Sequence, residues 1–225
     1  MKTKNLKQIS VVAVFSAIAF LLTFLFKFKV SFLTFDFKDA IIAIVSLTFG
    51  SVYGVASAAV VALLEFLSIS DTGLYGLIMN FISSGTFALI FGSLYKYKRT
   101  FNGAIFSAVF SAIGVTTVMM LANYFITPYY MGVSRGDVLA LIPTLLLPFN
   151  LAKTVINAAA TLILYKPVTN ALKRVGVLQG KNTEIQKFNK KSLILTVVSL
   201  LVIIVAILFV IFYLNGGFKF IAING

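Results

Sequence analysis

Long apolar runs dominate this sequence and limit the folds that it can adopt. Several reach the roughly 20 residues that an α-helix needs to cross about 30 Å of hydrocarbon, residues 9–26 and 193–214 among them. Of the 225 residues, 60% are apolar and only 11% are charged, about half the charged fraction of a soluble domain. The apolar residues follow one another instead of alternating, which is not the pattern of a membrane β-barrel. We therefore predict an all-α polytopic membrane protein.

Glycines and charged segments divide the runs into individual helices. Gly50 and Gly54 interrupt the second run, so we expect two short helices there, neither of which comfortably crosses a bilayer alone. Residues 27–39, 67–75 and 127–137 are polar or aromatic and are interpreted as loops. The expected helices are 9–26, 40–49, 52–66, 76–94, 103–125, a helix from Pro143 or Pro148 to about 165 or 172, and 193–214. We divide the chain into a membrane domain at 1–175, a basic cytoplasmic linker at 176–192, and an additional transmembrane helix with a short tail at 193–225.

Basic residues are distributed unevenly over the loops that these helices define. With a cytoplasmic N-terminus, 13 of the 19 basic residues fall on the cytoplasmic side and 5 outside, while Lys153 remains inside a helix. Five acidic residues fall outside: Asp36, Asp39, Glu65, Asp71 and Asp137. This imbalance follows the positive-inside rule. We expect a multi-pass protein of the cell membrane whose N-terminus is cytoplasmic.

The net charge of +13 would suggest a nucleic-acid partner in a soluble protein. In a membrane protein, basic loops are explained by topology and by contact with anionic lipid in the bilayer. We therefore expect lipid and no nucleic acid as the partner of this charge.

Missing residue types exclude most catalytic functions. The chain has no cysteine and no histidine, which removes thiolate nucleophiles, imidazole bases and most transition-metal sites. It has no GxxxxGK[ST] loop, so it does not hydrolyse ATP by that route. No pair of carboxylates is expected within the membrane, which leaves no obvious proton relay. We expect a binding protein that relies on a separate motor or acts as a passive facilitator, with no metal and no cofactor.

Polar residues form a stripe on the helix that contains LLPFNLAKTVINAAAT. Asn150, Lys153, Asn157 and Thr161 lie within about 80° of one another at 100° per residue. Lys153 is roughly 7 Å below Pro148 at 1.5 Å per residue. One interpretation is that Lys153 snorkels to the headgroups. The other is that the stripe faces an interior cavity, because ionisable residues in membrane helices usually mark a site and asparagine does not snorkel.

Two other helices carry an asparagine at a similar outer depth, Asn80 and Asn123. Each alone is also explained by helix–helix hydrogen bonding, and most nearby tyrosines by the interfacial aromatic belt. Together the three helices suggest a pocket for a neutral, polar ligand, since asparagine both donates and accepts. Phe35, Phe37 and Tyr75 are placed to cover a flat apolar ring.

Four segments, in order and spacing, resemble a known family. They are FLTFDFKDAI (32–41), GLIMNFISS (76–84), NYFITPYYMG (123–132) and LLPFNLAKTVIN (146–157). The chain from about 5 to 175 resembles the riboflavin-specific substrate-binding subunit of energy-coupling-factor (ECF) transporters, the RibU family. The resemblance implies a six-helix bundle with a short second helix, and residues 176–225 lie outside it.

The resemblance also implies function, ligand residues and partners. It implies a high-affinity riboflavin receptor with its site near the outer face, which works with a transmembrane coupling subunit and two cytoplasmic ATPase subunits. Family ligand contacts map to Asn123, Asn150 and Lys153, and less directly to Asn80 and the 33–38 loop. We add Phe35 and Asp36 from that loop, and Asn157 from the stripe, to the expected ligand-binding residues. The family's small-residue docking pattern maps to Ala13 and Ala17 on the first helix.

Lys38 departs from the family pattern, which has a small polar residue there; it either alters affinity or faces water. Two alternatives stay open beside the riboflavin receptor. One is a receptor for another vitamin, although a cationic ligand needs a carboxylate and only Glu65 lies near the pocket depth. The other is a structural membrane protein whose polar residues only join helices.

Overall fold

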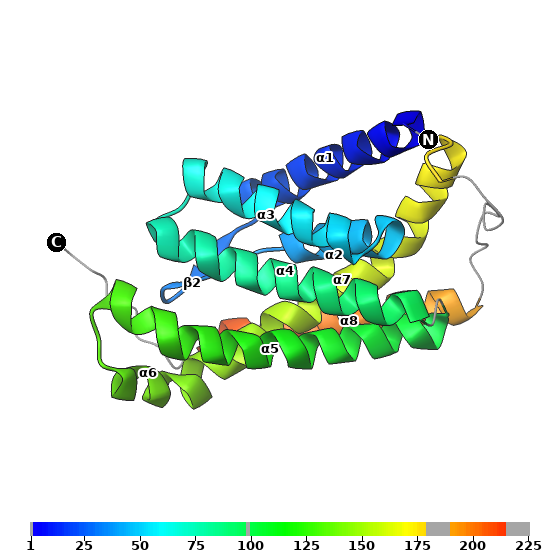
Figure 1. Cartoon of the computed structure of the whole chain (residues 1–225). Coiled ribbons are helices and arrows are strands. Elements are labelled where there is room, and N and C mark those ends of the chain that lie inside the picture. The colour runs from blue at the N-terminus through cyan, green and yellow to red at the C-terminus, as the bar shows by residue number, and fades with distance from the viewer. Residues whose placement is uncertain (1, 98–99, 179–189, 215–225) are drawn as a thin grey trace.

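The structure is a computed structural model that describes residues 2–97, 100–178 and 190–214. It is a bundle of long helices with one short hairpin (Figure 1). The elements are α1 (Lys2–Leu25), β1 (Phe28–Val30), β2 (Leu33–Phe35), α2 (Lys38–Phe49), α3 (Ser51–Ser68), α4 (Gly73–Tyr97), α5 (Phe101–Met131), α6 (Arg135–Leu141), the π-helical turn η1 (Ile142–Leu146), α7 (Leu147–Arg174), α8 (Lys190–Phe209) and the π-helical turn η2 (Val210–Leu214). Six segments of the described chain are long and apolar enough to cross a membrane, which confirms the predicted fold class.

The short helix α2 lies inside the bundle. Ten of its 12 residues are buried, and α1, α3, α4 and α7 pack around it. At Ser46, α2 lies close to both α4 and α3. The Ser46 hydroxyl donates to the carbonyl of Ala88 in α4 at 2.6 Å. Gly54 of α3 leaves room on the other side, since a Cβ added there would lie 2.5 Å from Ser46 Cβ. Small residues at such crossings let helix backbones come together.

The prediction that neither short helix spans alone is wrong for the second one. Helix α3 has 18 residues and is itself one of the six candidate spans, because 18 residues cover about 27 Å at 1.5 Å per residue. Of these two helices, only α2, with 12 residues, is too short to cross a bilayer.

All three predicted loops contain regular structure. In residues 27–39, β1 pairs with β2 in an antiparallel hairpin that places Phe28 opposite Phe35. In residues 67–75, α3 ends at Ser68 and α4 starts at Gly73. In residues 127–137, α5 continues to Met131 and α6 starts at Arg135. Ser134 and Asp137 form a capping box at the start of α6, a sequence signal for a helix N-terminus that the loop interpretation passed over.

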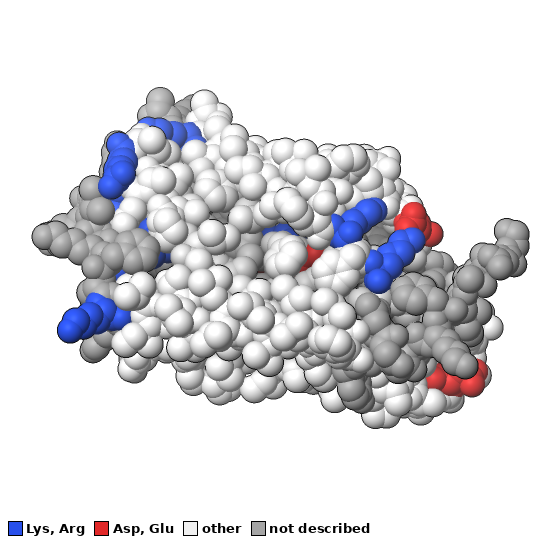
Figure 2. Space-filling model, turned by 180° about the vertical axis from the view of Figure 1, so that it is seen from behind, with Lys and Arg blue, Asp and Glu red and all other residues white. Residues whose placement is uncertain are grey.

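The connections gather at two ends of the bundle. The start of α1 and the end of α7 lie together at one end, whereas the hairpin, the α3–α4 connection and the α5–α6 connection lie at the other (Figure 1). The Lys7 ammonium donates to the carbonyl of Gly176 at 2.9 Å. On the face in Figure 2, the end with the start of α1 shows basic and no acidic side chains, and acidic side chains lie towards the opposite end. This separation agrees with the predicted topology, and the cytoplasmic position of the N-terminus stays a prediction.

Helix α8 packs along α7 and reaches the hairpin side of the bundle. Val210, which follows it, is buried in a cluster with Phe35 and Phe149. The additional helix therefore supports the same region as the hairpin. The domain division stays a prediction, and residues 179–189 of the linker and 215–225 of the tail lie outside the described residues.

Candidate functional site

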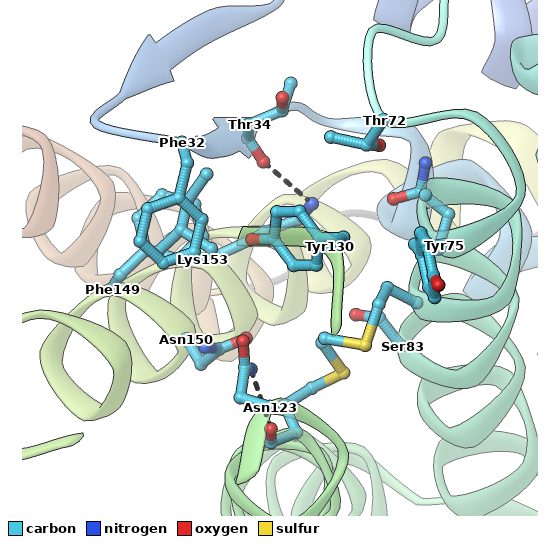
Figure 3. Close-up of a pocket in the computed structure, with 15 residues that line it drawn as sticks. Phe32, Thr34, Thr72, Tyr75, Ser83, Asn123, Tyr130, Phe149, Asn150 and Lys153 are labelled. Atoms are coloured by element: carbon cyan, nitrogen blue, oxygen red, sulfur yellow. Dashed lines mark hydrogen bonds between the residues drawn. The ribbon is translucent and has the colours of Figure 1, made fainter. Parts of the chain in front are cut away.

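A cavity of about 110 Å³ lies between the hairpin and helices α4, α5 and α7 (Figure 3). Its lining consists of Phe32, Leu33, Thr34, Thr72, Tyr75, Gly76, Met79, Asn80, Ser83, Met119, Asn123, Tyr130, Phe149, Asn150 and Lys153. Four of the seven predicted ligand residues are in this lining: Asn80, Asn123, Asn150 and Lys153. Tertiary structure thus brings together the asparagines of three helices, and their role in binding stays a prediction.

The other three predicted ligand residues lie behind the cavity wall. Asn157 is fully buried; its Nδ2 donates to the carbonyl of Asp36 at 3.0 Å and its Oδ1 accepts from the amide of Ala40 at 3.0 Å. Phe35 packs its ring against Phe149 at 6.0 Å between centroids. These contacts join α7 to β2, to the segment that follows it and to the first turn of α2, so the structure gives these residues protein partners instead of a place in the lining.

Lys153 does not snorkel in this structure. Its side chain is buried, and its ammonium donates to Asp36 Oδ2 at 2.8 Å and to the carbonyl of Thr34 at 3.1 Å. One lysine of α7 therefore holds both the second strand of the hairpin and the turn that follows it. The hairpin residues Phe32 and Leu33 of the cavity wall are positioned through this contact.

A buried cluster of charges lies beside the cavity and includes Asp36, Asp39 and Glu65; that no carboxylate pair lies within the membrane stays a prediction. Lys38 is 1% exposed, so it does not face water; its ammonium lies 2.7 Å from Glu65 Oε2 and 3.6 Å from Asp36 Oδ2. Asp39 is also buried and accepts from the Ser84 hydroxyl at 2.5 Å. Burial by itself raises the pKa of Asp36, but Lys153 and Lys38 outweigh it and hold that pKa below its usual value.

The amide groups in the lining are oriented by the protein. Asn150 Nδ2 donates to the carbonyl of Leu146 at 2.8 Å, and Asn123 Nδ2 donates to that of Met119 at 2.7 Å. Asn80 Nδ2 donates to Glu65 Oε2 at 2.7 Å. Each of these bonds uses one of the two N–H donors of the amide nitrogen and fixes the orientation of the amide. The oxygen of Asn123 already accepts from Thr127 at 2.9 Å.

Aromatic contacts and an ion pair connect the hairpin to its neighbours beside the cavity. Tyr130 contacts both Phe32 and Tyr75, with ring centroids 6.0 and 6.1 Å apart. Lys29 of β1 forms an ion pair with Asp71 in the α3–α4 connection, and its hydrogen bond and charge lower the pKa of Asp71. These contacts attach the hairpin to the rest of the bundle over the cavity.

The predicted docking residues Ala13 and Ala17 lie on α1, away from this cavity. Both are exposed, on a face that also exposes Val14 and Ile18. The face is accessible in the structure, and its role in docking stays a prediction.

Comparison with known proteins supplies the family. A family model described as "ECF transporter, substrate-specific component" matches residues 7–165. The chain is 33% identical to the riboflavin transporter RibU of Staphylococcus aureus over 75% of this chain and 94% of that protein. It is 28% identical to the riboflavin transporter FmnP of Bacillus subtilis over 74% of this chain and 93% of that protein. A solved structure described as "Structure and mechanism of the S component of a bacterial ECF transporter" matches with a TM-score of 0.65 at 32% identity, covering 76% of this chain and 99% of that one.

The matched region includes the hairpin, the charge cluster and every residue of the cavity lining. A substrate-specific transport component binds its substrate and is not an enzyme, which confirms the expectation drawn from the residue types. The chain belongs to the substrate-specific components of ECF transporters.

Proposed function

We propose that this protein is the riboflavin-binding subunit of an ATP-driven ECF importer, which takes up the vitamin at the outer face and passes it inward. The observation that carries this proposal is the cavity itself, where asparagines of α4, α5 and α7 meet Lys153 and a group of aromatic rings. The relatives named above are riboflavin transporters. The chemistry of the cavity and the names of these relatives support the same ligand.

The chemistry of riboflavin suits this lining. The vitamin is uncharged and combines a flat tricyclic ring with a chain of hydroxyl groups. Tyr75, Tyr130 and Phe149 offer apolar faces for the ring, and the asparagine amides offer hydrogen bonds for the polar groups. The cavity of about 110 Å³ is smaller than the roughly 300–1,000 Å³ of typical ligand sites. The cavity is not fully enclosed, so a ligand larger than this volume extends out of it or displaces side chains of the lining.

The partners of the proposed importer are a transmembrane coupling subunit and two cytoplasmic ATPase subunits. The sequence has no GxxxxGK[ST] loop, so in an ATP-driven importer the ATPase belongs to other subunits. Ala13 and Ala17 form the docking surface on α1, because small residues one turn apart let another helix approach closely. The N-terminus is cytoplasmic, in line with the excess of basic residues at that end.

The lining also bears on the alternative ligands. A cationic vitamin requires a carboxylate, and no carboxylate belongs to the described cavity lining. Glu65 is the nearest candidate from the sequence, but its oxygens already accept from Lys38 and Asn80. A neutral ligand is favoured.

Purification from cells grown with riboflavin tests the proposal. We expect a yellow protein with flavin absorption bands that quenches added riboflavin fluorescence. Asn150→Ala and Lys153→Ala should each weaken affinity at least about tenfold, the effect of losing a hydrogen bond worth about 1.4 kcal/mol. Lys96→Ala, at an exposed lysine of α4, is the control and should bind as the wild type does. A colourless protein that does not quench riboflavin would contradict the function, and unchanged affinity in both site variants would contradict the site.

A further inference from the structure

Glu65 of α3 is buried, and donors from two different elements meet its carboxylate. Lys38 Nζ, at the start of α2, lies 2.8 Å from Oε1 and 2.7 Å from Oε2. Asn80 Nδ2, on α4, lies 2.7 Å from Oε2. Because the ammonium group donates to both oxygens, both act as acceptors, and the group that meets Oε2 from α4 must be a donor. The carboxylate therefore distinguishes the nitrogen of the Asn80 amide from its oxygen.

This contact decides which end of the Asn80 amide is available to the cavity. An asparagine amide donates at one end and accepts at the other, and a 180° flip exchanges the two. A flip at Asn80 would place an oxygen against the Glu65 carboxylate, leaving two acceptors in contact. With Nδ2 held, Oδ1 is left for the cavity that Asn80 lines, and within the described ranges of the chain no protein group donates to it.

We propose that Glu65, held by Lys38, is a positioning residue that fixes Asn80 so that its Oδ1 accepts a hydrogen bond from an N–H or O–H group of the ligand. The inference rests on the proposed riboflavin site and adds a specificity determinant to it. Glu65 does not line the cavity and acts only through Asn80.

The same rule holds on the opposite wall of the cavity. Asn150 Nδ2 donates one of its N–H groups to the carbonyl of Leu146, which fixes the orientation of this amide with its oxygen turned away from that carbonyl. Acceptors on α4 and α7 thus favour a ligand that presents donors toward both helices. Riboflavin has such donors in its imide N–H and its hydroxyl groups, whereas an analogue whose donor is methylated has lost one.

A double-mutant cycle in riboflavin fluorescence quenching tests the inference. Asn80→Ala and Glu65→Gln should each weaken binding about tenfold, as expected for one misplaced hydrogen bond. If Glu65 acts through Asn80, the double variant should be no more than about twofold weaker than Asn80→Ala alone. Since Glu65→Gln leaves Lys38 with only the more distant Asp36 carboxylate, 3.6 Å away, the charge-free pair Lys38→Met/Glu65→Leu repeats the cycle with both members of the Lys38–Glu65 ion pair removed. Size-exclusion chromatography shows which variants are folded.

Ligand analogues separate positioning from a general structural effect. We use N3-methylriboflavin and riboflavins methylated at single hydroxyl groups. At least one of them should lose about tenfold in affinity on the wild type and less than about twofold on Asn80→Ala and on the charge-free pair, because those proteins no longer present the acceptor.

The outcomes distinguish the inference from the proposed function. Wild-type protein that binds riboflavin, together with additive effects of Glu65 and Asn80 or an unchanged analogue profile, would overturn the positioning role alone. An Asn80→Ala variant that binds riboflavin as tightly as the wild type would also overturn the positioning role alone. Wild-type protein that does not bind riboflavin would overturn the proposed function and the inference with it.

Discussion

Lys153→Met removes one ammonium group from α7 and keeps a side chain of similar length. In the structure this ammonium lies 2.8 Å from Asp36 Oδ2, and Lys153 and Asp36 are 6% and 1% exposed. Lys38 Nζ remains 3.6 Å from the same oxygen, while Asp36 Oδ1 has no hydrogen-bond partner among the described residues. The variant therefore leaves a buried carboxylate with one weaker partner.

The cost follows from this geometry. Removing one member of a buried ion pair costs about 3–5 kcal/mol. Coulomb's law gives the same order, since unit charges 2.8 Å apart attract by about 6 kcal/mol at an effective dielectric constant of about 20, and part of this is offset because the ammonium is no longer buried. With Lys38 still present, we expect the lower end, about 3 kcal/mol. For a chain of this length that corresponds to a melting temperature lower by roughly 6–12 °C.

The assay is thermal denaturation in detergent without ligand. Unfolding is detected by size-exclusion chromatography of heated samples, because the chain has no tryptophan whose fluorescence would report it. Lys96→Met, at an exposed lysine, is the matched control and should melt as the wild type does. The paired variant Lys153→Met/Asp36→Asn should recover most of the loss, since both members of this ion pair are then neutral. A Lys153→Met protein as stable as the wild type, or a paired variant as unstable as the single one, would refute the ion-pair reasoning.

Three further changes test the packing and the charges. Gly54→Ala should lower the stability to heating by about 1–3 kcal/mol, because the new Cβ meets Ser46 Cβ at 2.5 Å where α2 and α3 cross. Gly114→Ala is the control and should cost less in the same assay, because its added Cβ meets only the flexible tip of Ile90 at 2.5 Å. Asn157→Leu should cost about 1–3 kcal/mol, since it removes the donor to the Asp36 carbonyl and leaves the Ala40 N–H with only its longer bond to the carbonyl of Phe37 at 3.3 Å. An undiminished melting temperature would contradict its structural role. Lys29→Gln should change stability by no more than about 0.5 kcal/mol, because its ion pair is more than half exposed, and a large loss would show that the hairpin depends on it.

The sequence predicted the helices better than their ends. Long apolar runs identified the membrane helices, because the cost of exposing polar backbone to lipid leaves few other folds. The segment 127–137 was assigned to a loop for its polar and aromatic residues, yet α5 continues through Pro128 and α6 begins three residues after Gly132. Local composition does not decide how far a helix extends once neighbouring helices pack against it.

The sequence predicted the candidate site only in part, because the helical period relates residues of one helix and not residues of different helices. Asn150 and Lys153 are separated by three residues on one helix, so the helical period alone places them on one face. That Asn80 and Asn123 reach the same cavity was suggested by their similar depth, and the packing of α4 and α5 beside α7 then brings them together. Nothing in the sequence placed Asn157 behind the wall, because a polar stripe does not show where the cavity ends.

By itself, the sequence determined that this protein is helical, lies in a membrane and carries a polar face on α7, since each of these depends on composition or on the period of a single helix. Only the tertiary structure decided that Lys38 is buried against Glu65, and that Glu65 in turn orients Asn80. These residues come from three separate helices. Ion pairs and hydrogen bonds act over a few ångströms, so their partners are fixed by how helices pack and not by any pattern along the chain.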